Sequence, residues 1–134
     1  RDQIIPASFN VSCTCTRVNV IAGHTEAVFV GLQKKTTLDE IKRAWRDGYK
    51  DFLKLELPSA PPELVSYTDE PFRPQPRLDR NLHDGMTTVI GRLRNDNVLP
   101  NGIKYVLLSH NTKMGAAQGA VLTAEYLMKR GVIG

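Results

Sequence analysis

Two runs of β-branched residues, 18–21 and 27–32, stand on either side of Ala22 and Gly23. Such runs favour strands, and glycine suits a tight connection because it tolerates positive φ. We therefore expect a hairpin with His24 just past its turn. Opposed side chains in a hairpin lie about 5 Å apart at Cβ, so Arg17 and His24 would face one another and share a small anion. The alternative is a surface arginine and a turn histidine.

The size and composition of the chain point to one globular domain. Its 134 residues are 41% hydrophobic and 24% charged, and no apolar run approaches the length of about 20 residues that spans a membrane. The net charge is +4, with basic and aromatic residues dispersed, which argues against nucleic-acid binding. The sequence starts at Arg1 without Met or an apolar leader, so we expect a piece of a longer protein or a processed N-terminus.

The two cysteines, Cys13 and Cys15, are too close in sequence for an unstrained disulfide. No CxxC pair and no His/Cys spacing typical of a metal site occurs in the sequence. We expect two free thiols, buried and structural in role, in a protein of the reducing cytoplasm.

Periodicity predicts strands at 7–20 and 27–32 and then a helix. Thr37 and Glu40 have the spacing of a capping box at its start. An apolar stripe at helical spacing follows, made of Leu38, Ile41, Ala44, Trp45 and Phe52. Trp45 is therefore expected in the core rather than on a binding surface.

Three more strands are expected in the second half, at 64–67, 86–93 and 104–109, with a turn at 96–102. Between the first two lies a Pro- and Arg-rich irregular segment, 69–82, whose arginines would contact carboxylates, phosphates or a partner subunit. The last helix would be capped by Asn111 or Thr112 and end at Gly131. This order predicts an α+β domain with a mixed or antiparallel sheet and helices on one face.

Three blocks of the sequence resemble aspartate-semialdehyde dehydrogenase of the archaeal and fungal-type branch. They are CTRVNVIAGHTEAV at 15–28, RPQPRLDR at 73–80, and LSHNT at 108–112 followed by GAA at 115–117. The blocks occur in the family's order and span nearly the whole chain. The resemblance implies a glyceraldehyde-3-phosphate-dehydrogenase-like C-terminal domain over 1–134, whose sheet supports a homodimer. It also implies that the helix within 111–131 packs on a nucleotide-binding domain that this chain lacks.

The resemblance further implies NADPH-dependent reduction of aspartyl phosphate to aspartate semialdehyde, with release of phosphate. This step belongs to lysine, threonine and methionine biosynthesis. The matched positions make His24 the base, Arg17 the anchor of the substrate carboxylate, and Asn111 with Gly115 part of the cofactor site. Small residues at a helix N-terminus would let backbone N–H groups approach the ligand, although they also permit a tightly packed helix.

Two parts of the family pattern are missing. The chain has neither the Ser-Asn-Cys-Ser-type segment that carries the family's nucleophile nor a GxGxxG fingerprint for NADP. We therefore expect NADP to be bound mainly by the missing domain, and the chain alone to be inactive and dimeric. The alternative is a non-catalytic homodimerisation module. His83 and His110 have no distinctive local context and are expected to be structural or solvated.

Overall fold

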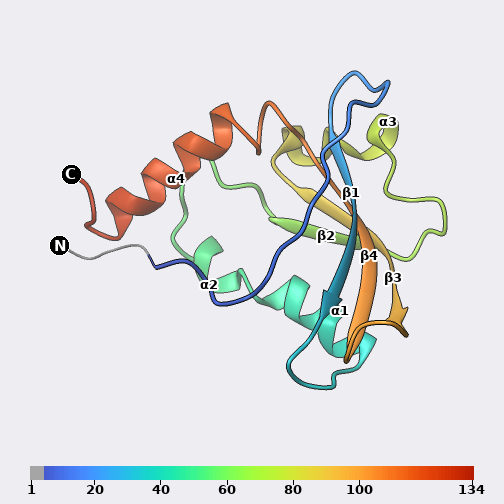
Figure 1. Ribbon diagram of the computed structural model, residues 1–134. Coiled ribbons are helices and arrows are strands. Elements are labelled where there is room, and N and C mark those ends of the chain that lie inside the picture. The colour runs from blue at the N-terminus through green and yellow to red at the C-terminus, as the bar shows by residue number, and fades with distance from the viewer. Residues whose placement is uncertain (1–4) are drawn as a thin grey trace.

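The computed structural model describes residues 5–134, which form a four-stranded sheet with helices packed around it (Figure 1). In chain order the elements are β1 (His24–Gly31), α1 (Leu38–Asp47), α2 (Lys50–Leu53), β2 (Val65–Thr68), α3 (Pro76–Asp79), the 3-10 turn η1 (Leu82–Gly85), β3 (Thr88–Asp96), β4 (Gly102–Ser109) and α4 (Ala117–Lys129).

The sheet has the strand order β1-β4-β3-β2. β4 pairs antiparallel with β1 and with β3, whereas β2 and β3 run parallel, so the predicted mixed sheet is confirmed. A register shift interrupts the β3–β4 ladder between Gly91 and Arg94. The strands expected at 27–32, 64–67, 86–93 and 104–109 correspond to these four, with ends displaced by a few residues.

Helix α1 covers one face of the sheet and begins as its sequence predicts. Thr37 and Glu40 form a complete capping box, in which each side chain accepts the other residue's backbone N–H. Trp45 packs from α1 against Tyr67 of β2 and Tyr105 of β4, with ring centroids 6.0 and 5.0 Å away. Trp45 is half-buried and packs against the sheet, as expected of a packing residue, although it is not among the buried core residues.

A second packing cluster joins α4 to the rest of the molecule. Leu57, Met86 and Leu122 form its buried centre, and the Phe52 and Tyr126 rings pack beside them. The opposite side of α4 is exposed and carries apolar side chains, including Val121 and Met128. Gly131 follows the helix at φ +68°, as predicted.

The expected strand at 7–20 and the hairpin built on it are wrong. Residues 5–23 contain no strand, and β1 takes β4 as its only partner in the described chain. A strand needs a ladder of backbone bonds, and at 18–20 the chain instead folds on itself, with the Val20 N–H donating to Val18 O at 2.9 Å. Cys13 and Cys15 are free, as predicted, but exposed rather than buried, since they lie in this segment.

The start of α4 also differs from its prediction. The helix begins at Ala117, after Ala116, and no side chain caps it. Asn111 and Thr112 instead lie in the preceding turn, where both engage other groups. No helix within residues 5–134 is long and apolar enough to cross a membrane.

Candidate functional site

His24 is the first residue of β1 and lies opposite Ser109, the last residue of β4. Its side chain is exposed. The antiparallel register therefore places the first sequence block at the same end of the sheet as the turn that follows β4.

Gly23 fastens these two segments together. Its backbone N–H donates to Asn111 Oδ1 at 3.1 Å, although the residues are 88 positions apart. Gly23 is buried at φ +111°, and a Cβ there would lie 3.0 Å from Leu108 Cδ1. Both the conformation and the close approach require glycine.

The Arg- and Pro-rich segment reaches the same point from the face of the sheet opposite α1. A Cβ on Gly23 would lie 3.7 Å from Arg80 Cβ and 3.8 Å from Pro76 Cβ. The three sequence blocks, separated along the chain, therefore converge on Gly23.

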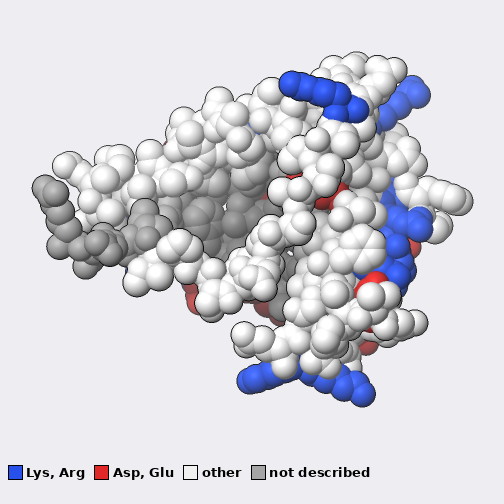
Figure 2. Space-filling model, in the orientation of Figure 1, with Lys and Arg blue, Asp and Glu red and all other residues white. Residues whose placement is uncertain are grey.

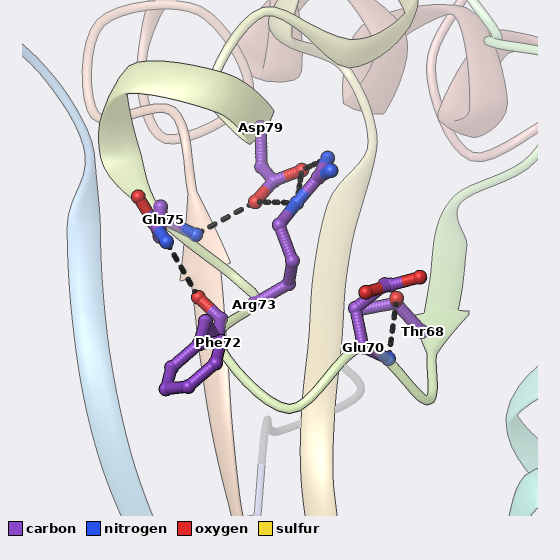
Figure 3. A network of polar contacts seen from close by, with 6 residues as sticks. All are labelled: Thr68, Glu70, Phe72, Arg73, Gln75 and Asp79. Atoms are coloured by element: carbon purple, nitrogen blue, oxygen red, sulfur yellow. Dashed lines mark hydrogen bonds and ion pairs between the residues drawn. The ribbon is translucent and has the colours of Figure 1, made fainter.

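Residues 72–80, which we call the arm, are held by a buried carboxylate (Figure 3). Asp79, only 3% exposed, accepts bonds from Arg73 Nε and Nη2 and from the Gln75 backbone N–H, the last at 2.6 Å. The Gln75 side chain donates in turn to Phe72 O at 2.8 Å. The bond to Asp79 raises the pKa of Arg73 above its ordinary value.

Most arginines in and beside the arm are thus engaged within the chain. Arg73 binds Asp79, Arg80 donates to Pro76 O at 3.2 Å, and Arg92 donates to Pro71 O at 2.6 Å. The prediction that they contact carboxylates holds for Arg73, but its partner is internal. Arg77 is exposed.

Arg17 lies in the irregular segment before β1 and is exposed. The structure does not place it opposite His24 in a hairpin, because β4 occupies that position. Its role as an anchor therefore depends on the sequence match and not on a measured contact with His24.

The turn between β4 and α4 satisfies its own backbone donors. The N–H groups of Gly115, Ala116 and Ala117 donate to the carbonyls of His110, Lys113 and Thr112, at 2.9, 3.2 and 3.3 Å. These three N–H groups therefore already have acceptors within the chain, and cofactor contact at this turn stays a prediction.

The same turn still fits a flat ligand such as a nicotinamide group. Gly115, Ala116 and Ala117 are exposed and have little or no side chain, so a ring could lie against them. Asn111 Oδ1 is engaged by Gly23, which leaves the amide nitrogen as the group to donate to a ligand. Within residues 5–134 there is no cluster of His, Cys, Asp and Glu that could hold a metal ion.

His110 is the residue that sequence reasoning missed. It is 6% exposed, and its Nδ1 accepts the Thr112 backbone N–H at 3.2 Å. Nearby, Lys113 forms an ion pair with Asp84. His110 lies within the third sequence block, LSHNT, directly after β4 and before Asn111, and this position was a usable signal.

Charge is distributed over the visible face without forming one basic surface. Figure 2 shows Lys and Arg in separate groups at opposite ends and along one edge, with largely uncharged surface between them. Exposed apolar side chains occur in the segment before β1, where Ile21 is 92% exposed.

Comparison with known proteins identifies the class to which this fold and site belong. Residues 1–114 match the family model described as "Semialdehyde dehydrogenase, dimerisation domain". The chain therefore belongs to the semialdehyde dehydrogenase family, in its dimerisation domain.

The similar proteins of known name are aspartate-semialdehyde dehydrogenases. The Methanothermobacter thermautotrophicus enzyme is 46% identical over 123 residues, covering 91% of this chain and 35% of the enzyme. The Cryptococcus neoformans enzyme is 42% identical over 134 residues, covering 98% and 36%. The crystal structure of the Candida albicans enzyme with NADP superposes with a TM-score of 0.71 at 37% identity, covering 85% of this chain and 32% of that one.

These similarities confirm the resemblance to the archaeal and fungal-type branch and the predicted fold class. This chain spans about a third of the length of the curated relatives that it matches.

Proposed function

We propose that this chain is the catalytic and dimerisation part of an NADP-dependent aspartate-semialdehyde dehydrogenase, a cytoplasmic enzyme of lysine, threonine and methionine biosynthesis. The parent enzyme would reduce aspartyl phosphate to aspartate semialdehyde and release phosphate. The observation that carries the proposal is the convergence of three sequence blocks on Gly23, at the end of the sheet where His24 is exposed.

His24 is the proposed base. The acyl carbon is attacked by a cysteine thiolate supplied from outside this chain, and a neutral imidazole can accept that thiol's proton and return it later. His24 is exposed at the start of β1, so it is accessible to a thiol on a neighbouring domain. The β1–β4 pairing and the Gly23–Asn111 bond fix where its backbone lies.

Arg17 and the turn after β4 are proposed to bind the two ligands. The Arg17 guanidinium can hold the substrate carboxylate through two parallel hydrogen bonds. The Asn111 amide nitrogen and the exposed surface of Gly115 would hold the nicotinamide end of NADP. When bound, this cofactor supplies the hydride that reduces the acyl group.

The proposal is tested in the full-length enzyme by the phosphate-dependent reduction of NADP with aspartate semialdehyde. His24→Asn should lower kcat by about 10²-fold or more, the range for loss of a general base. Arg17→Leu should lower kcat/KM for aspartate semialdehyde, mainly through KM.

Matched variants serve as controls. His83→Asn replaces another exposed histidine at a positive φ that asparagine tolerates, and the asparagine amide can keep the 2.9 Å contact with Thr87 Oγ1. Arg43→Leu removes an exposed arginine on α1. Both should retain activity within about twofold, as expected for surface positions. Activity that does not depend on His24 would contradict the assignment of the base.

The non-catalytic alternative has one supporting observation, which is that the matching family model describes a dimerisation domain. The two functions are compatible. The two functions can be distinguished by mixing this chain with the nucleotide-binding part of the enzyme. A catalytic part should restore turnover, whereas a dimerisation module should only associate with itself.

A further inference from the structure

The turn that carries Asn111 is organised by His110. The imidazole Nδ1 accepts the Thr112 N–H at 3.2 Å and lies 3.3 Å from Thr112 Oγ1. The carbonyl of His110 accepts the Gly115 N–H at 2.9 Å. His110 therefore binds two later residues of the turn, Thr112 through its side chain and Gly115 through its carbonyl. Asn111 lies within the loop that these bonds close.

The imidazole itself is held against the loop at η1. Gly85 is buried at φ +79°, and a Cβ there would lie 2.8 Å from His110 Cδ2. His83 and Asp84 also have positive φ, so three successive residues take a left-handed backbone to let the ring approach. The Lys113–Asp84 ion pair ties the turn to the same loop.

The hydrogen bonding defines the protonation state of the ring. Nδ1 accepts a backbone N–H, so a neutral ring carries its proton on Nε2. Burial, and then the positive charges of Lys113 and Arg80, hold the pKa of His110 below its ordinary value, while Asp84 acts in the opposite direction. Within residues 5–134, Lys113, Arg80 and Asp84 are the charged groups that act on the ring.

We propose that His110 is a positioning residue for the catalytic site, whose neutral imidazole sets the turn so that Asn111 meets Gly23 and the start of β1 is fixed. His110 acts through the chain His110 to Asn111 to Gly23 and does not touch the substrate. Its effect on catalysis depends on the proposed function, whereas its effect on the Gly23–Asn111 bond does not.

The structural step is tested on this chain by hydrogen exchange of the Gly23 amide, measured by NMR. His110→Phe removes the acceptor but keeps a ring, and His110→Asn can place Oδ1 near the position of Nδ1. The protection of Gly23 should fall about tenfold in His110→Phe, the effect of losing one hydrogen bond, and stay within about twofold in His110→Asn. Amides of the β3–β4 ladder, such as Leu107, report that the fold is retained.

A second measurement needs no substitution, in case His110→Phe does not fold. Acidification protonates Nδ1 and removes the same acceptor, so Gly23 protection should fall relative to Leu107 in the original chain but not in His110→Asn. Unchanged Gly23 protection in both experiments, or equal loss in the Phe and Asn variants, would overturn the proposal.

In the full-length enzyme, His110→Phe should lower kcat by about tenfold with little change in KM, and His110→Asn should restore it. If His24→Asn abolishes activity while His110→Phe does not, the positioning role fails and the proposed function stands. If neither His24→Asn nor His110→Phe affects activity but Gly23 protection falls in His110→Phe, the proposed function fails and the structural step stands.

Discussion

The Gly23 N–H donates to Asn111 Oδ1 across 3.1 Å, which ties the residue before β1 to the turn after β4. This bond links two of the three sequence blocks, and the third packs beside it through Pro76 and Arg80. The contribution of this junction to the stability of the chain can be measured by substituting Gly23.

Gly23→Ala should destabilise the chain by about 3 kcal/mol, because a Cβ adds a 3.0 Å contact with Leu108 Cδ1 to the cost of positive φ. Gly131→Ala is the matched control, since Gly131 also has positive φ but no atom of residues 5–134 within 4 Å of its Cβ position. It should cost about 1 kcal/mol. Urea denaturation compares the two, and equal losses would show that the space around Gly23 is unimportant.

The arm should depend on the Arg73–Asp79 pair. Asp79→Ala leaves a half-buried guanidinium and the Gln75 N–H without their acceptor, at a cost of about 2–3 kcal/mol. Asp79→Asn should cost less, since its Oδ1 can still accept the Gln75 N–H. A double-mutant cycle with Arg73→Ala should give a coupling free energy of about 1–3 kcal/mol. Strict additivity would mean that the pair contributes nothing.

The capping box should make α1 sensitive to acid. Hydrogen bonds from the Thr37 backbone and from the Thr36 and Thr37 side chains lower the pKa of Glu40 to about 2. Because the folded pKa is depressed, this contribution is complete above the ordinary value of 4.5 and is lost as the pH falls towards 2.

Glu40→Gln keeps the cap hydrogen bonds without the charge, so its stability should fall less between pH 4.5 and 2 than that of the original chain. Asp39→Asn, which changes a neighbouring acid in the same turn, is the control. The readout is the urea midpoint against pH. Parallel curves for the original chain and Glu40→Gln would show that the cap is not the source of the loss of stability in acid.

The proposed homodimer is expected to use the sheet face opposite α1. Phe29 lies on that face, is 59% exposed and neighbours Lys104 in the register. Phe29→Asp should therefore shift sedimentation equilibrium towards monomer by about tenfold or more in the dissociation constant, as for a buried aromatic anchor. Val121→Asp, on the exposed side of α4 and 51% exposed, should not. A dimer that tolerates Phe29→Asp would assign the interface elsewhere.

Local signals in the sequence were sufficient for some elements. The Thr37–Glu40 spacing predicted the start of α1, because a capping box needs only residues three apart. The helical stripe likewise predicted that Trp45 packs against the rest of the domain, where it contacts Tyr105.

Signals that depend on distant partners were not sufficient. Residues 18–21 have strand-forming side chains, so the sequence predicted that they pair with β1 in a hairpin. The partner of β1 is instead β4, some 80 positions further on, and no local pattern reveals that pairing. For the same reason His110 could not be assigned to Gly85 before the loop that brings them together was known. Arg73 and Asp79 are only six positions apart, but they lie in a segment without a regular period, so their spacing did not predict a contact. The convergence of the three sequence blocks on Gly23 could therefore be recognised only from the folded structure.

The position of β1 at one edge of the sheet has a consequence for the order of folding. Its only partner within residues 5–134 is β4, so the loop between them must close before β1 gains any backbone pairing. Closing a loop of this length costs entropy before contacts repay it, which slows folding. During synthesis, the strand that begins with His24 stays unpaired until Ser109 has left the ribosome. The proposed catalytic base is thus among the last parts of the chain to reach its place.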